Sequence, residues 1–124
     1  MESKQPTLLI VDDDSRNIFA LGLMLKSKGY PSVSATDAKT GIHLLQTSPN
    51  VKTVLLDMMM PGMDGYEAIS VIKSLSELKE LKIIAVTAQA MPGDREKCLA
   101  AGADAYISKP VDIDLLLDML KKIE

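Results

Sequence analysis

Polar residues that could take part in chemistry follow four short apolar runs of this sequence. A short apolar run closed by turn residues is typical of a buried strand, so each polar residue should lie at the carboxyl tip of a strand. The four tips are Asp12-Asp13-Asp14 after Leu8 to Val11, Asp57 after Val54 to Leu56, Thr87 after Ile83 to Val86, and Lys109-Pro110 after Tyr106 to Ser108. Open parallel α/β sheets bind ligands at this edge, so we expect one shared site there.

These groups together indicate metal-assisted phosphoryl transfer. Crowded carboxylates repel one another and each buried charge is costly, so the acidic cluster needs a counter-cation. Oxygen ligands in a small open site suit Mg²⁺, with Mn²⁺ as the alternative. Asp57 could then act as a carboxylate nucleophile toward phosphorus. The metal and Lys109 would offset charge on the phosphoryl oxygens, and the Thr87 hydroxyl could donate a hydrogen bond to one of them.

The scaffold that must position these groups is predicted by the order of the elements. Five strand-like runs alternate with five helical patterns, which requires a parallel sheet covered by helices on both faces. We expect an α/β fold, a doubly wound (βα)5 sandwich of three layers like that of flavodoxin, with the five strands in the order 2-1-3-4-5. This order makes the first and third strands neighbours, so Asp12, Asp13 and Asp57 share one crevice. The predicted strands are Thr7 to Val11, Ser32 to Ala35, Thr53 to Asp57, Ile83 to Thr87 and Ala105 to Ser108.

Capping residues and glycines predict where the helices begin and end. The first helix begins near Ser15, whose hydroxyl is a good N-cap, and the charge of Asp14 favours the same end. The third begins at Asp64, with Glu67 as its capping-box partner. The predicted helices run from Ser15 to before Gly29, from Asp37 to before Ser48, from Asp64 to Leu75, from Pro92 to before Gly102, and from Asp112 to Ile123.

With these features in order, the chain resembles the response-regulator receiver domains of two-component signalling, most of all those of hybrid histidine kinases. The resemblance covers the chain from about Pro6 to its end, and it implies that Asp57 accepts a phosphoryl group from a histidine kinase or a histidine phosphotransfer protein. The matching features are the Asp12-Asp13 pair, Asp57, the turn Pro61-Gly62-Met63-Asp64-Gly65, Thr87 and Lys109-Pro110.

The resemblance also implies roles for individual residues. Asp13 and Asp57 would ligate Mg²⁺ directly, together with the Met59 backbone carbonyl, and Asp12 would act through water. Met59 and Gln89 occupy positions that tune dephosphorylation in this family. Neither side chain carries an acid or a base, so we expect self-dephosphorylation to be intermediate to slow.

A switch is implied by the resemblance as well. Tyr106 matches the aromatic switch position of the family, and Lys109-Pro110 matches its cis peptide bond. A phosphate on Asp57 would draw Thr87 inward and admit the Tyr106 ring to the vacated space. Partner binding would then change on the surface made by the helix between Pro92 and Gly102, the strand Ala105 to Ser108 and the last helix. The sequence does not specify the downstream target.

Composition limits the class of protein and its partners. A length of 124 residues fits a single receiver domain over 1–124, with an ordered core from about residue 6. The net charge of -3 and an aromatic content of 3% argue against nucleic-acid binding. No apolar run approaches the roughly 18 residues that span a membrane, and the polar start is no signal peptide, so we expect a cytoplasmic protein. It should be a monomer or a weak phosphorylation-linked dimer.

Two alternatives to a phosphoacceptor remain open. A pseudo-receiver would keep the fold as a protein-binding module without phosphorylation, although the complete set of site residues disfavours this. A Mg²⁺-dependent phosphatase with an aspartate nucleophile would need an acid-base aspartate two positions after Asp57, where this chain has Met59. We therefore expect a signalling phosphoacceptor that assists its own phosphorylation and dephosphorylation, and no enzyme of free metabolites.

Overall fold

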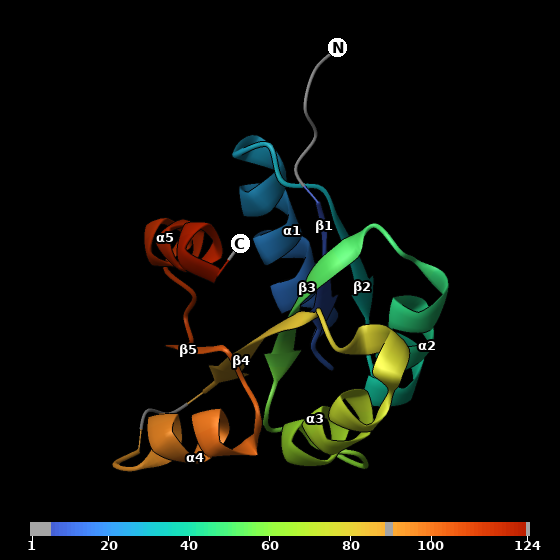
Figure 1. The fold of residues 1–124 in the computed structure, drawn as a ribbon. Helices are drawn as coiled ribbons and strands as arrows, with labels where there is room; N and C mark the ends of the chain where they lie inside the picture. Colours follow the sequence, from blue (N-terminus) through green and yellow to red (C-terminus); the bar gives the residue numbers. More distant parts are fainter. Residues whose placement is uncertain (1–5, 89–90, 124) are drawn as a thin grey trace.

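The computed structural model describes residues 6–88 and 91–123, and in it a five-stranded parallel sheet lies between two layers of helices (Figure 1). Gln89 lies outside the described residues. The strands are β1 (Thr7–Val11), β2 (Ser32–Ala35), β3 (Val51–Asp57), β4 (Lys82–Thr87) and β5 (Ala105–Ser108). The helices are α1 (Ser15–Ser27), α2 (Ala38–Thr47), α3 (Gly65–Ser74), α4 (Asp94–Ala101) and α5 (Ile113–Ile123), with a short 3-10 helix over Ser76–Leu78.

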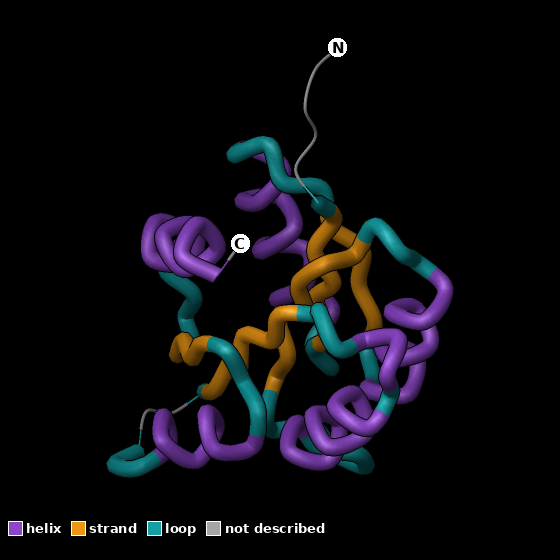
Figure 2. Tube along the Cα trace, viewed as in Figure 1, coloured by secondary structure: helices purple, strands orange, loops and turns teal. Residues whose placement is uncertain are grey.

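The strand order is β2-β1-β3-β4-β5, with every pair parallel, which confirms the predicted topology. Alternate strand residues face opposite sides of a sheet, so β1 contributes to two cores. Leu8 and Ile10 pack with residues of α1 and α5, whereas Leu9 and Val11 pack with residues of α2 and α3. Figure 2 shows the strands in orange between the purple helices. Both faces are therefore covered, which explains the nearly continuous apolar runs of the strands.

The N-terminus of α1 differs by one residue from the prediction. Asp14, rather than Ser15, is the N-cap: its backbone is extended and its side chain accepts a hydrogen bond from the Arg16 N–H at 2.9 Å. Ser15 is the first helical residue. Both residue types are good caps, and the extended exit of the chain from β1 decides the choice because it places Asp14 at the last non-helical position.

Other boundaries follow from caps and from packing. Asp64 and Glu67 form the predicted capping box at α3, and the Asp112 side chain accepts hydrogen bonds at the start of α5. β3 begins at Val51, two residues before the predicted start at Thr53, because the buried Val51 already pairs with Thr7 of β1. The pairing register shifts between Thr7 and Leu8, so the residues before Thr53 do not continue the regular alternation of the strand. The alternation therefore does not predict the pair of Thr7 with Val51.

The turn after β3 folds back against the strand at Gly65. The Met58 N–H donates to the Val86 carbonyl at 2.9 Å, and the Gly65 N–H donates to the Met58 carbonyl at 3.3 Å. A Cβ atom on residue 65 would lie 2.6 Å from the Met58 Cα, closer than real Cβ contacts come. The absence of a side chain at Gly65 thus fixes how closely the start of α3 approaches the tip of β3 beside Asp57.

We predict that Gly65→Ala lowers the free energy of unfolding by about 1–3 kcal/mol, because the new methyl group overlaps the backbone of Met58. Gly22→Ala is the matched control, since its Cβ would meet only the Ser32 Oγ at 3.5 Å. Alanine is the better helix former, so this variant should gain up to about 1 kcal/mol. Urea denaturation measures both. Equal effects of the two substitutions would contradict the close approach at Gly65.

Candidate functional site

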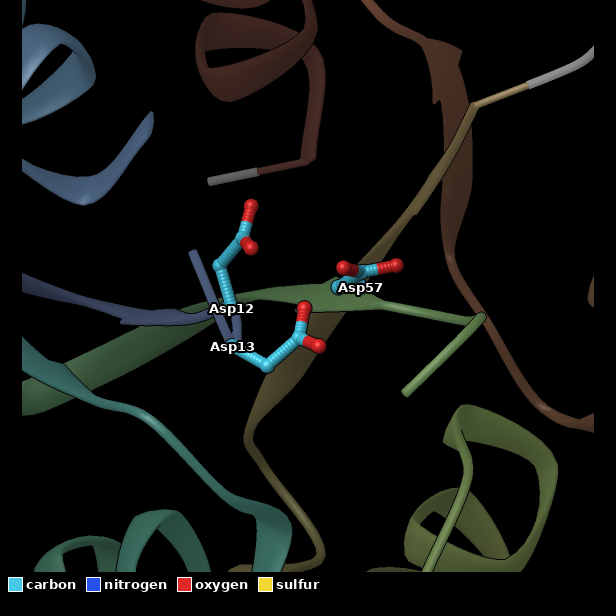
Figure 3. A group of neighbouring side chains, drawn as sticks. All are labelled: Asp12, Asp13 and Asp57. Atoms are coloured by element: carbon cyan, nitrogen blue, oxygen red, sulfur yellow. The ribbon is translucent and has the colours of Figure 1, made fainter. Parts of the chain in front are cut away.

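Three aspartates come together where β1 and β3 end. Asp12 and Asp13 follow β1, Asp57 is the last residue of β3, and the two strands pair with Val11 opposite Leu56. Each carboxylate places one oxygen within 4.8 Å of the others, and Figure 3 shows the three side chains around one space. Asp12 and Asp57 are only 6% and 4% exposed, while Asp13 is exposed to solvent. The predicted crevice between the first and third strands is therefore present.

Lys109 lies between the two buried acids. Its Nζ is 3.0 Å from the Asp12 Oδ2 and 3.3 Å from the Asp57 Oδ2. Lys109 follows β5, and its N–H donates to the Thr87 carbonyl at 2.7 Å. The following peptide bond, to Pro110, is cis, as predicted. One ammonium faces three carboxylates, so the site keeps an excess of negative charge that favours a further cation.

The pKa of Lys109 reflects two opposing effects. Burial by itself lowers it, but the hydrogen bond to Asp12 and the negative charges of Asp57 and Asp12 outweigh burial and raise the pKa above its ordinary value of 10.5. Lys109 is therefore protonated at neutral pH. Because the folded pKa is the higher one, the stabilisation from its ion pairs is complete below the unfolded pKa and is lost as the pH rises through the folded pKa.

Backbone groups fix the second oxygen of each buried acid. The Asp57 Oδ1 accepts a hydrogen bond from the Met59 N–H at 2.9 Å, and the Asp12 Oδ1 accepts one from the Asp14 N–H at 2.8 Å. Each buried carboxylate is thus held between a backbone N–H and the Lys109 ammonium. Within the described part of the chain, the Asp13 carboxylate makes no hydrogen bond or ion pair. Asp13 is the acid whose oxygens are both available to an incoming cation.

The residues that could ligate a cation at this edge are suited to a hard ion. The group offers carboxylate oxygens and contains no histidine or cysteine among the described residues. The neighbouring methionines do not form a soft-metal site, because Met58 and Met60 are buried in the core and the Met59 side chain is 70% exposed. The donor set therefore fits Mg²⁺ or Mn²⁺. A ligand role for the Met59 carbonyl stays a prediction.

Thr87 and Tyr106 lie on one face of neighbouring strands. Tyr106 pairs with Ala85 of β4, and Thr87 is two residues further along the same strand, so both side chains project toward the α3 and α4 side of the sheet. Thr87 is buried and Tyr106 is half-buried. Burial and the nearby charge of Asp94 raise the pKa of the Tyr106 phenol above its usual value, so the ring is neutral at physiological pH. The two side chains thus lie on the same face of the sheet, as a movement of the Tyr106 ring toward Thr87 would require. That movement stays a prediction.

A cavity of about 360 Å³ opens beside the acidic cluster, between α1, the sheet and the chain after β5. Its polar end is formed by Asp12, Asp57 and Lys109. The remaining lining is mostly apolar: Ile10, Val11, Asn17, Ala20, Leu21, Met24, Leu55, Val86, Pro110 and Val111. Nothing in the sequence pattern predicts this cavity, because it depends on how α1 and the Pro110-Val111 segment sit over the sheet.

Comparison with known proteins relates the chain to one family. A family model described as the response regulator receiver domain matches residues 8–121. A Thermotoga maritima protein named cyclic di-GMP phosphodiesterase is 37% identical over 110 residues, which are 89% of this chain and 28% of that protein. A Dictyostelium discoideum protein named hybrid signal transduction histidine kinase I is 33% identical over 119 residues, which are 91% of this chain and 7% of that protein. The chain thus spans less than a third of these relatives.

A solved structure supports the same relationship. The response regulator receiver protein from Pseudomonas putida superposes with a TM-score of 0.87 at 28% identity, over 98% of this chain and 99% of that one. Together with the match to a hybrid kinase, this confirms the family predicted from the motifs at the strand tips. A separate finding concerns membranes: among the described residues, no helix is long and apolar enough to cross one.

We predict that Lys109→Met lowers the free energy of unfolding by roughly 1–3 kcal/mol in buffer without divalent cations, because Asp12 and Asp57 are left close together without their shared cation. The side chain of Lys109 is 23% exposed, so the loss should be smaller than for a sealed ion pair. The difference should be the same at about pH 7 and about pH 9, since Lys109 keeps its proton over that range. Thermal and urea unfolding measure it, with the exposed Lys39→Met as control. Equal losses in the two variants would contradict this role of Lys109.

Proposed function

The chain belongs to the response regulator receiver family, and on that premise we propose that Asp57 accepts a phosphoryl group from the phosphohistidine of a histidine kinase or a histidine phosphotransfer protein. One observation carries the proposal: a buried acid at a strand tip is held 3.3 Å from an ammonium beside two further carboxylates. A structural aspartate would not need this surrounding. A cluster that binds a cation and receives a phosphoryl group would.

In the proposed reaction, an oxygen of Asp57 attacks the phosphorus as the phosphorus–nitrogen bond of the donor histidine breaks. The new bond is an acyl phosphate, and the histidine nitrogen keeps the electron pair of the broken bond. The Met59 N–H and the surrounding strands hold the Asp57 carboxylate in place. Lys109 lies where it can move from the carboxylate to the arriving phosphoryl oxygens, and the Thr87 hydroxyl can donate a hydrogen bond to one of them.

The divalent cation would be held by Asp13 and Asp57, by the Met59 backbone carbonyl, and by Asp12 through water. When bound, Mg²⁺ would offset the negative charge of the transferring phosphoryl group. The chain's own contribution is the spacing of the acids. Asp12 and Asp57 are held by backbone hydrogen bonds, and among the residues that the structure describes Asp13 makes no bond that a cation would have to replace.

We extend the proposal to the switch. Phosphorylation would draw Thr87 toward the phosphoryl group, and the Tyr106 ring would occupy the vacated space. The surface of α4, β5 and α5 would then change its affinity for a partner. Exposed Met91 and half-buried Leu99 are available on this surface. Ala103, which follows α4, is only 7% exposed and belongs to the core beneath this surface.

A protein donor must dock next to Asp57, and α1 offers an apolar surface for it. Phe19 and Leu23 are 68% and 52% exposed, one turn apart on the helix that begins directly after the acidic residues. Large apolar side chains grouped on a surface favour a protein contact. Residues Asn17 and Ala20 of the same helix line the cavity that leads to Asp57, so a partner seated on α1 would have access to the acceptor.

The rival functions have less support. A phosphatase would need a general acid two residues after Asp57, and Met59 cannot act as one. A pseudo-receiver would not need Lys109 and three acids in contact range. We therefore propose a non-enzymatic signalling domain in the cytoplasm.

We predict that the protein gains one phosphoryl group, an increase of about 80 Da in intact mass, on incubation with acetyl phosphate and Mg²⁺. Asp57→Asn should remove the adduct because the amide is a poor nucleophile, and EDTA should prevent it. Intact-mass spectrometry reads all three, and circular dichroism checks that the variant is folded. An unmodified but folded wild-type protein would favour the pseudo-receiver.

We also predict that Phe19→Ser with Leu23→Ser slows phosphoryl transfer from a purified phosphohistidine protein by about tenfold or more, because part of the docking surface is lost. The rate with acetyl phosphate should be unchanged, since this small donor needs no docking surface. Leu115→Ser, which alters an exposed leucine on α5, is the control. Slowing with both donors would show damage to the site itself.

A further inference from the structure

A second cavity, of about 280 Å³, lies at the opposite end of the sheet from Asp57. It is where β3 and β4 begin, at the end of the sheet that lies toward the N label in Figure 1, and the last turns of α5 close one side. None of its residues belongs to the acidic site. The lining residues are Pro6, Leu8, Tyr30, Lys52, Thr53, Glu80, Lys82, Leu120 and Ile123.

Thr53 supplies a buried polar group on the floor of this cavity. It is 7% exposed, and it shares with Leu55 the face of β3 that points toward α1 and α5. Within the described residues, the Thr53 hydroxyl has no hydrogen-bond partner, although every side-chain nitrogen or oxygen sealed from solvent has one. The hydroxyl must therefore face the cavity, where a ligand atom can reach it. A polar ligand atom in the cavity could take the place of solvent as the hydrogen-bond partner of this hydroxyl.

The mouth of the cavity carries an excess of positive charge. Lys52, Lys82 and Glu80 line it, and none of them forms an ion pair within the described part of the chain. Two ammonium groups against one carboxylate leave a net charge of about +1. This charge contrasts with the net charge of -3 of the whole chain. The mouth therefore attracts a single negative charge.

The apolar walls of the cavity determine the chemistry of the uncharged part of the ligand. Leu8, Leu120 and Tyr30 are all buried, and with Ile123 they surround the cavity with aliphatic and aromatic surface. A volume of about 280 Å³ is at the lower end of small-molecule sites, so the ligand has about ten non-hydrogen atoms. An inorganic phosphate would satisfy the charge but would leave the apolar walls uncovered.

We propose that this cavity binds a small organic carboxylate whose apolar body is an aromatic ring or a short branched chain. The carboxylate accepts a hydrogen bond from the Thr53 hydroxyl and pairs with Lys82 or Lys52, and the apolar body packs against Leu8 and Leu120. The site is independent of the proposed function, because it shares no lining residue with the cavity beside Asp57 and Lys109. It would exist in the same form in a chain that is never phosphorylated.

The test uses benzoate as the probe and benzamide as its neutral analogue, titrated into the ¹⁵N-labelled 124-residue chain. We expect saturable amide shift changes at Leu8, Thr53 and Ile123 with benzoate, and at least about fivefold weaker binding of benzamide. Thr53→Val and Lys82→Met should each weaken benzoate binding by about fivefold or more. Lys79→Met, which removes an exposed lysine that does not line the cavity, should leave it unchanged.

Several results would overturn the proposal. Equal binding of benzamide would exclude recognition of the carboxylate, and unsaturable or scattered shifts would exclude a defined site. Equal affinity in Thr53→Val and Lys82→Met would place the probe elsewhere. A chain without residues 2–5 gives a further check: if its free spectrum already differs around Leu8 and Thr53, and it binds benzoate more tightly, residues before Pro6 are the natural occupant. Because Lys82→Met changes a partly exposed side chain, it remains informative even if Thr53→Val fails to fold.

Discussion

The repulsion between carboxylates at one edge of the sheet is the constraint on which the rest of the site depends. Asp12 and Asp57 are both nearly buried, and they can remain charged there because Lys109 lies within 3.3 Å of each. Removing one member would leave an uncompensated buried charge. The cluster is also incompletely neutralised, since Asp13 adds a third negative charge. The same imbalance that makes the site costly for stability favours a further cation.

This arrangement requires a parallel sheet with β1 beside β3. Parallel strands end at the same edge, and the crossover of the chain between β2 and β3 places the tips of β1 and β3 next to each other. Lys109 follows β5, two strands away from β3, and its N–H donates to the Thr87 carbonyl on the intervening strand β4. The ion pairs therefore also tie the last strand and the start of α5 to the centre of the sheet.

The two ends of the sheet have opposite electrostatic character. The carboxyl end holds the aspartates, and the amino end holds the mouth formed by Lys52, Lys82 and Glu80. Both cavities lie on the α1 and α5 side, because α1 and α5 leave space over the sheet at both ends. On the other side, residues of α2, α3 and α4 fill the core. There the buried Cys98 thiol lies 3.7 Å from the Tyr66 hydroxyl, as expected for a structural cysteine.

The sequence was sufficient to predict the strand tips and the residues at them, because apolar runs closed by acids and turn residues are local signals. The strand order was predicted from the alternation of five strands with five helices, to which the sequence also points. It also determined the capping box of Asp64 and Glu67. It could not decide between Asp14 and Ser15 as the cap of α1, or place the start of β3 at Val51, because those depend on the exit angle of a strand and on pairing with Thr7. The folded chain was needed to show that Lys109 bridges Asp12 as well as Asp57, that backbone N–H groups hold both acids, and that Thr53 lines a cavity. Those contacts join residues that are distant in the chain, and their distances are set by how helices and strands pack rather than by any local pattern.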